Sequence, residues 1–296
     1  MKIAVTTPTG KIGKVVANEL VTAGAQVILL ACNPDKVKAL TDRGATVLQG
    51  SQDDREYVVR ATRGVDALFW LIPPDYSVPD LRAYYNRVGE VAVAAIQANR
   101  IGRIVFLSSV GADQEGGTGP ILGLRDVEQK LERVASHITH LRPAAFFENY
   151  LWQFEPIKHM GKIFLPVSGS TQVAMVATQD IGRAAAKRLL DTALTGRSVA
   201  NLLGPTDISF DEAAAAIGRG IGKPVTHVQV PEDQARQAMK QAGMGDDSIG
   251  LMLELYRAMS SGLLKVPEGR TAESTTPTTM EQFARNVLKP MIGPAS

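Results

Sequence analysis

The sequence contains few of the residues that form disulfides and metal sites. Among 296 residues there are one cysteine, Cys32, and four histidines. A single cysteine excludes an internal disulfide and a metal centre built from several cysteines. The histidines lack the spacing of metal ligands, so we expect them at the surface or in packing and predict no metal site. They are His137, His140, His159 and His227.

Long apolar runs and clusters of basic residues are also missing. No apolar segment approaches the roughly 20 residues of a membrane-spanning helix. The net charge is only +2, and no run of lysine and arginine indicates contact with nucleic acid. The first residues lead directly into an apolar segment without a basic leader. We therefore expect a cytoplasmic protein that binds neither membrane nor nucleic acid directly.

The first 150 residues alternate short apolar runs with amphipathic segments. The predicted strands are Ile3–Thr6, Gln26–Ala31, Thr46–Gln49, Ala67–Ile72, Arg103–Leu107 and His137–Leu141. The predicted helices are Lys14–Ala23, Pro34–Arg43, Arg55–Thr62, Leu81–Asn99 and Arg125–Ala135. This alternation predicts an α/β fold with a Rossmann-like, doubly wound parallel sheet. Parallel strands end at one edge of the sheet, where ligands bind in such folds.

The remaining residues are less regular. The predicted strands are Met160–Leu165, Gln172–Val176, Val199–Leu203 and Val225–Val230. Predicted helices run from Thr178 to Leu190, from the capping box at Ser209 to near Gly222 and from Pro231 to Ala242. After a break at Gly243–Asp247 another helix is predicted to about Ser260, and a last one over Met280–Leu288. We expect residues 1–150, with 178–204 returning to them, to form one domain. Residues 151–177 and 205–296 then form a smaller C-terminal α+β lobe over the sheet edge.

The turn after the first predicted strand is the most informative segment. Thr7-Pro8-Thr9-Gly10-Lys11-Ile12-Gly13 joins this strand to an apolar helix. Such a turn directs backbone N–H groups and the positive end of a helix at one point, which suits a pyrophosphate. Gly10 and Gly13 have the spacing that close backbone approach requires. Thr7 stands where such turns usually have glycine, and because threonine resists positive φ we expect an altered loop.

Four segments in order resemble the NmrA-like family, an atypical branch of the short-chain dehydrogenase/reductase superfamily. They are Thr9-Gly10-Lys11-Ile12-Gly13, Asn33-Pro34-Asp35-Lys36, Ser108-Ser109-Val110-Gly111-Ala112 and Leu141-Arg142-Pro143-Ala144-Ala145-Phe146-Phe147-Glu148-Asn149. The resemblance covers most of the chain. It implies a Rossmann-like domain that binds NADP(H) or NAD(H), and a C-terminal lobe that bounds a cleft for a small-molecule substrate. The cofactor contacts that it implies are Thr7, Thr9, Gly10, Lys11, Ile12, Gly13, Cys32, Asn33, Lys36, Ile72, Pro73 and Ser108.

The end of the second predicted strand bears on the choice between NADP and NAD. Cys32 stands where many relatives have the arginine that binds the 2′-phosphate of NADP. No acidic residue ends this strand to bind the ribose hydroxyls of NAD. Lys36 offers a charge for the phosphate, although a solvated lysine at a helix start explains it equally well. We expect NADP(H) in preference to NAD(H).

The catalytic pair of the superfamily, a tyrosine with a lysine four residues later, is absent. None of the six tyrosines has such a lysine. If Glu128 matches a helical glutamate of relatives, Pro120 and Leu124 occupy the two positions, and a shift of one residue places Arg125 in the lysine position. Arginine cannot be deprotonated in proteins. The catalytic residues are thus unknown: Tyr76 and Ser109 are candidates, and water is an alternative proton source.

Residues after the sixth predicted strand are predicted to contact a substrate together with Ser109. They are Phe147, Asn149, Tyr150 and Trp152. Their aromatic rings suit the wall of an apolar pocket, although core packing is the simpler explanation. Asn149 and Glu148 are also explained as residues that hold the crossing between the domains together.

Three functions are compatible with the sequence. The first is a reductase that transfers hydride from NAD(P)H to a quinone-like or other conjugated aromatic molecule. The second is a non-catalytic NADP(H) sensor that acts through a protein partner. The third is a redox-silent isomerase, cyclase or lyase on the same fold. The missing tyrosine and lysine favour the sensor, whereas an aromatic cleft and a separate lobe favour the reductase. An oligomer is compatible with each.

Overall fold

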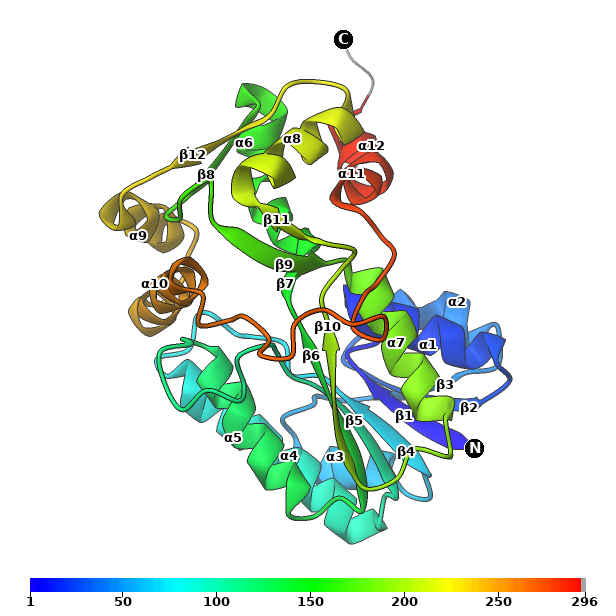
Figure 1. The fold of residues 1–296 in the computed structure, drawn as a ribbon. Helices are drawn as coiled ribbons and strands as arrows, with labels where there is room; N and C mark the ends of the chain where they lie inside the picture. Colours follow the sequence, from blue (N-terminus) through cyan, green and yellow to red (C-terminus); the bar gives the residue numbers. More distant parts are fainter. Residues whose placement is uncertain (294–296) are drawn as a thin grey trace.

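A seven-stranded parallel sheet forms the centre of the molecule, which a computed structural model describes for residues 1–293 (Figure 1). The strand order is β10-β6-β5-β4-β1-β2-β3, and every neighbouring pair is parallel. The strands are β1 (Lys2–Thr6), β2 (Gln26–Ala31), β3 (Thr46–Gln49), β4 (Ala67–Trp70), β5 (Arg103–Leu107), β6 (His137–Pro143) and β10 (Arg197–Leu202). The predicted Rossmann-like α/β fold is confirmed.

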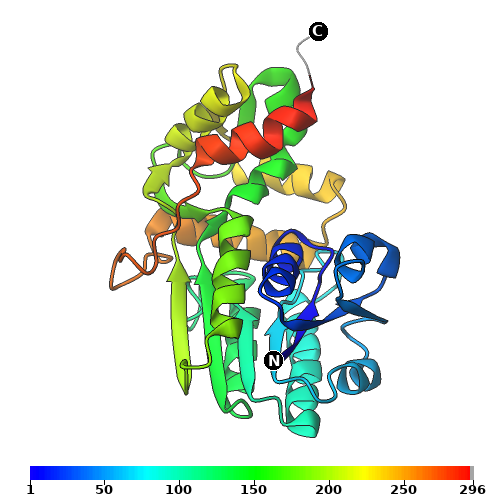
Figure 2. The same ribbon diagram turned by 90° about the vertical axis from the view of Figure 1, so that its right-hand side faces the viewer.

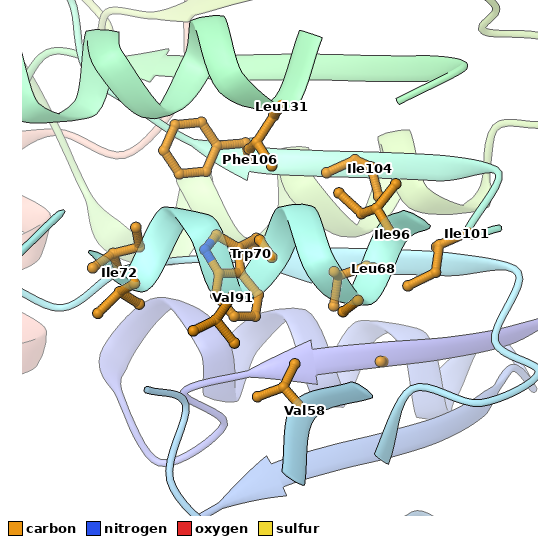
Figure 3. Close-up of a cluster of buried hydrophobic side chains, with 14 of the residues drawn as sticks. Val58, Leu68, Trp70, Ile72, Val91, Ile96, Ile101, Ile104, Phe106 and Leu131 are labelled. Carbon is orange, nitrogen blue, oxygen red and sulfur yellow. The ribbon is translucent and has the colours of Figure 1, made fainter. Parts of the chain in front are cut away.

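Helices cover both faces of this sheet. One face carries α1 (Lys11–Thr22), the 3₁₀ turn η1 (Pro34–Val37), α2 (Lys38–Thr41) and α7 (Thr178–Leu190), and α1 and α7 lie side by side (Figure 2). The other face carries α3 (Arg55–Ala61), α4 (Leu81–Asn99) and α5 (Ile121–Glu132). The central strands β1, β2, β4 and β5 supply alternate apolar side chains to the two faces, as a sheet buried on both sides requires. Figure 3 shows Trp70, Phe106 and Leu131 among the buried side chains of the second face.

Several predicted boundaries shift where turns provide the first helical residues. Helix α1 begins at Lys11 rather than Lys14, since Gly10 is its N-cap and the glycine turn itself forms the first helical turn. Helix α5 begins at Ile121 rather than Arg125, directly after Pro120. The single helix predicted over 34–43 is divided between η1 and α2. Strand β4 ends at Trp70, before Pro73-Pro74. In contrast, the bounds predicted for β2, β3, β5, α4 and α7 are confirmed.

The C-terminal segments form smaller sheets above the carboxyl ends of the main strands (Figure 1). One sheet contains β7 (Ala145–Phe146), β9 (Gln172–Val176) and β11 (Asp207–Ser209), and another contains β8 (Lys162–Leu165) and β12 (Thr226–Gln229). The helices are η2 (Phe147–Gln153), α6 (Phe154–Met160), α8 (Phe210–Ile221), α9 (Glu232–Gln241), α10 (Asp246–Ser261), α11 (Met280–Phe283), the π-helical η3 (Ala284–Leu288) and α12 (Lys289–Ile292). The predicted capping box at Ser209 is confirmed.

The pair of helices α9 and α10 contacts the main sheet through the loops at its carboxyl edge. The backbone of Gly119, just before α5, lies so close to α10 that a Cβ there would be 2.1 Å from the Leu251 carbonyl oxygen. No helix within residues 1–293 is long and apolar enough to cross a membrane. The last three residues of the predicted lobe, 294–296, lie outside the described residues, and the division into two domains stays a prediction.

Candidate cofactor and substrate site

The turn between β1 and α1 is closed by backbone contacts. The N–H of Gly10 donates to the carbonyl of Thr7 at 3.0 Å. A Cβ on Gly13 would lie 2.2 Å from the same carbonyl oxygen, so this position requires glycine. Thr7 has a φ of 50°, so the expectation that threonine would avoid this conformation is wrong. The surrounding contacts outweigh the cost of a left-handed threonine, which is about 1–2 kcal/mol.

The N-terminus of α1 is open to an anion. Its N-cap, Gly10, makes no side-chain hydrogen bond, and the first turn contains no acidic residue. The N–H groups that precede Lys14 therefore have no acceptor within the helix, and the helix dipole adds positive potential. The hydroxyl of Thr7 is buried and has no partner among residues 1–293. These groups fit the pyrophosphate of a dinucleotide.

The cofactor residues predicted after β2 lie at the surface. Cys32, Asn33 and Lys36 are all exposed. The Asn33 side chain accepts from the Asp35 N–H at 3.0 Å and caps η1. Lys36 has no ion-pair partner among residues 1–293, so its charge is available to a bound phosphate.

The ends of β4 and β5 supply one buried and unpartnered hydroxyl. Ser108 is 3% exposed, and its Oγ has no hydrogen-bond partner in the part of the chain described. Its backbone N–H donates to the Leu141 carbonyl at 2.8 Å, which fixes it beside β6. The Ser109 hydroxyl instead donates to the Val110 carbonyl at 3.1 Å. At the end of β4, Ile72 is buried and Pro73 is exposed.

Tyr76 and Trp152 meet at this edge. Their ring centroids are 6.3 Å apart with an angle of 76° between the planes. Trp152 is 66% exposed, whereas Tyr76 is half-buried and burial raises the pKa of its phenol. The Gly245 N–H, just before α10, donates to the Tyr76 carbonyl at 2.8 Å and fixes this loop.

Two other aromatic residues predicted at the substrate are turned into the C-terminal core. Phe147 is 1% exposed, and its ring centroid lies 5.8 Å from that of Phe283. The Tyr150 hydroxyl donates to the Met175 sulfur at 3.8 Å, and burial raises its pKa. These positions favour the packing interpretation, and substrate contact stays a prediction. Asn149 is exposed.

Glu148 holds the crossing from the main sheet to the C-terminal segments. Its carboxylate accepts hydrogen bonds from the Thr178 N–H at 3.0 Å and from the Thr178 hydroxyl at 2.5 Å. Burial raises the pKa of Glu148, against the effect of these bonds and of nearby Lys11. The N-cap of α7 is Ala177, which makes no side-chain hydrogen bond, and Glu148 binds the helix start instead.

Helix α5, which follows Pro120 and contains Leu124, supplies Glu128 to a buried ion pair. Arg142 binds Glu128 through two hydrogen bonds of 2.9 Å and 2.6 Å. Burial alone would lower the pKa of Arg142, but the Glu128 carboxylate outweighs it and raises this pKa. Arg125 lies 3.7 Å from Glu115. Within residues 1–293, no three histidine, cysteine or acidic side chains are grouped as a metal site would require.

Two contacts at this edge had no counterpart in the sequence analysis. The Asp247 carboxylate accepts from the Leu81 N–H at 3.0 Å, so the start of α10 caps the start of α4. The side-chain amide of Gln52, after β3, donates to the Leu71 carbonyl at 2.8 Å. The side-chain carbonyl oxygen of Gln52 is buried and has no partner in the described chain. Asp247 and Leu81 are 166 residues apart, and no local pattern indicates such a pair.

Known proteins resemble the chain over most of its length. The (4-alkanoyl-5-oxo-2,5-dihydrofuran-3-yl)methyl phosphate reductase of Streptomyces griseus is 32% identical, with 80% of each chain covered. The quinone oxidoreductase 2 of Escherichia coli is 26% identical, with 88% of each chain covered. The solved structure of Citrobacter sp. triphenylmethane reductase with NADP(H) has a TM-score of 0.80 at 22% identity, and covers 97% of this chain and 99% of its own.

The family comparison agrees with the four segments and with the fold. The model of the NmrA-like family matches residues 1–284. This match includes the glycine turn, the strand ends of the main sheet and most of the C-terminal segments. The chain therefore belongs to the NmrA-like family.

Proposed function

We propose that the protein is a reductase that transfers hydride from NADPH to a quinone-like or other conjugated aromatic molecule. The turn between β1 and α1 carries this proposal, because its open N–H groups and the position of Gly13 suit a dinucleotide. Relatives named as reductases, among them a quinone oxidoreductase, support the choice of reaction.

The cofactor would lie across the carboxyl ends of the main strands. The α1 N-terminus and the Thr7 hydroxyl would hold its pyrophosphate, and Ser108 offers a hydroxyl further along the edge. A bound nicotinamide supplies the hydride. We further propose NADP(H) over NAD(H), since exposed Lys36 can pair with a 2′-phosphate and no carboxylate ends β2 to bind ribose hydroxyls.

The proton that accompanies the hydride needs a source other than the usual tyrosine and lysine pair. Tyr76 lies in the loop after β4, and its phenol, whose pKa is raised by burial, is protonated at neutral pH. The Ser109 hydroxyl is occupied by the Val110 carbonyl. We therefore favour Tyr76 or water as the proton donor, with Ser109 behind them.

Titration with NADPH, NADP⁺, NADH and NAD⁺, followed by nicotinamide fluorescence and heat, tests the cofactor. We expect the tightest binding for NADPH. Lys36→Ala should weaken NADPH binding roughly tenfold and leave NADH unchanged, since one charge-assisted hydrogen bond is lost. Lys38→Ala, a change at a lysine paired with Asp42, is the matched control and should leave both affinities unchanged. Absence of dinucleotide binding would refute the proposal and favour a redox-silent enzyme.

A second candidate is a dinucleotide sensor that acts through a protein partner. The absence of the usual tyrosine and lysine pair favours it, and Glu128, on the helix where that pair is expected, is instead bound by Arg142. A sensor should distinguish NADPH from NADP⁺ in affinity but should oxidise no NADPH with any quinone. Steady NADPH oxidation by a quinone would exclude it.

A further inference from the structure

Tyr76 and Trp152 belong to segments far apart in the sequence that meet where the main strands end. Tyr76 lies in the loop after β4, and Trp152 lies in η2, which follows β6 and β7. The two rings are in edge-to-face contact with centroids 6.3 Å apart. The contact therefore joins the centre of the sheet to the C-terminal segments on the side where a dinucleotide would lie.

The exposure of Trp152 is not explained by folding. The residue is 66% exposed, more than any other large apolar residue within residues 1–293. The other tryptophan, Trp70, is 0% exposed in the core of the sheet (Figure 3). An indole that stays in contact with water contributes little to the free energy of folding, because it buries little apolar area. The open face of Trp152 is instead available to a ligand.

The angle between the rings determines how a planar ligand can bind. A ring inserted between two parallel rings needs about 7 Å, which is two van der Waals separations of about 3.5 Å. The centroids of Tyr76 and Trp152 are closer than this and the planes are nearly perpendicular, at 76°. A planar ligand therefore cannot insert between them. It can stack on Trp152 and meet Tyr76 at its side.

Tyr76 offers a polar group at that side. Three tyrosine hydroxyls donate within the described residues, those of Tyr57, Tyr84 and Tyr150, whereas Tyr85 and Tyr256, like Tyr76, have no such acceptor there. The Tyr76 hydroxyl has no such acceptor within residues 1–293, while its backbone is fixed by Gly245. A phenol with an unused O–H can donate a hydrogen bond to a carbonyl oxygen.

We propose that Trp152 and Tyr76 form a binding platform for planar conjugated carbonyl compounds. The ligand stacks on the indole of Trp152, and one of its carbonyl oxygens accepts a hydrogen bond from Tyr76. The inference rests on the proposed reductase function for the reaction, and it adds the residues that select the substrate. A fused-ring quinone covers more of the indole than a single-ring quinone, so the platform favours the larger acceptor.

Tryptophan fluorescence tests the platform without turnover. A fused-ring quinone is titrated into the protein in the presence of NADP⁺, which carries no hydride. Saturable quenching is expected in the wild type and in Met160→Ala, a control at another exposed apolar side chain. Trp152→Phe leaves only buried Trp70 and should lose the quenching. Quenching that stays in Trp152→Phe, or that rises linearly without saturation, would overturn the proposal.

Kinetics with NADPH test the same platform independently. Trp152→Ala should raise the KM for the fused-ring quinone roughly tenfold with little change in kcat, and the KM for a single-ring quinone less. Tyr76→Phe should keep the fluorescence quenching while raising KM or lowering kcat. Equal effects of Trp152→Ala on both quinones would contradict the proposal. If the wild type oxidises no NADPH with any quinone, the reductase function fails, and the quenching titration still decides whether the platform binds.

Discussion

Two regions at the carboxyl edge of the main sheet are constructed by different means. The turn between β1 and α1 depends on backbone groups: the Thr7 carbonyl, the Gly10 N–H and the missing side chain of Gly13. The region between β5, α5 and β6 depends on side chains, above all the buried pair of Arg142 and Glu128. The comparison teaches that the proposed cofactor turn depends on backbone geometry, whereas the region beside α5 depends on a buried ion pair.

Removal of Arg142 should give the largest effect of any single change considered. Arg142→Met leaves the Glu128 carboxylate, whose side chain is 4% exposed, without its partner. The free energy of unfolding should fall by about 3–5 kcal/mol, because an unpaired buried charge is costly. Denaturant unfolding measures this loss. Dinucleotide affinity of the folded fraction should be kept, since the turn lies in the other region.

Two controls sharpen this first test. Lys38→Met breaks the exposed pair with Asp42 and should cost less than about 1 kcal/mol. Arg142→Met combined with Glu128→Leu removes both charges and should recover much of the loss. If Arg142→Met lowers the free energy of unfolding no more than Lys38→Met does, the ion pair of Arg142 and Glu128 does not stabilise this region.

The variant Gly13→Ala tests the turn between β1 and α1, which depends on backbone groups. Gly13→Ala places a Cβ 2.2 Å from the Thr7 carbonyl oxygen, so the turn must open. We expect a loss of about 1–3 kcal/mol in the free energy of unfolding, and a loss of NADPH binding. Thermal unfolding and fluorescence titration measure the two effects.

The chain provides a matched glycine for this experiment. Gly250 lies in α10, and a Cβ there meets nothing within 4 Å. Gly250→Ala should raise the free energy of unfolding by about 0.5–1 kcal/mol and leave NADPH binding unchanged. Normal NADPH binding in Gly13→Ala would show that the turn does not hold the cofactor.

The contrast between the two regions also explains what could be predicted from the sequence. Strand β5 and helix α7 have the predicted bounds, because apolar periodicity and helix signals are local. The glycine turn was identified because its geometry depends on Gly10 and Gly13, three residues apart. Partners such as Arg142 and Glu128 lie on different elements, and each residue alone has no pattern that indicates the other.

The same reasoning applies to the substrate side. Tyr76 and Trp152 were each named from the sequence, but their contact depends on how η2 crosses the sheet edge. Phe147 and Tyr150 belong to the same aromatic cluster in sequence, yet both are buried among C-terminal side chains. In a 3₁₀ helix residues three apart share one face, so Phe147 and Tyr150 are buried together while Trp152 lies on another face, and the sequence does not indicate that η2 is 3₁₀.

A pH experiment tests how the charge of His140 affects the stability of the region between β5, α5 and β6. His140 is 1% exposed, and burial lowers its pKa below the ordinary value of 6.5, against the effects of Glu128 and Glu132. The folded protein therefore keeps His140 neutral where the unfolded chain takes up a proton. Stability is fully present above about pH 6.5 and is lost as the pH falls toward the lowered pKa.

The expected slope is at most about 1.4 kcal/mol per pH unit for one proton. Unfolding free energies of the wild type and of His140→Gln are compared from neutral to mildly acidic pH. The variant should show a flatter profile over this range. Parallel profiles would mean that groups other than His140 dominate the acid sensitivity.

The smallest effect separates the two roles of Thr7. Thr7→Gly relieves a positive φ, but glycine gains entropy in the unfolded chain, so the free energy of unfolding should change by less than about 1 kcal/mol.

The variant Thr7→Gly also removes the buried hydroxyl that has no partner within residues 1–293. NADPH affinity should fall by roughly three- to tenfold if this hydroxyl binds the pyrophosphate. Thr7→Ser keeps the hydroxyl and should bind NADPH as the wild type does. Equal NADPH affinities of Thr7→Gly and Thr7→Ser would mean that backbone groups alone bind the cofactor at this turn. The turn would then differ fully from the Arg142 region, which depends on side chains.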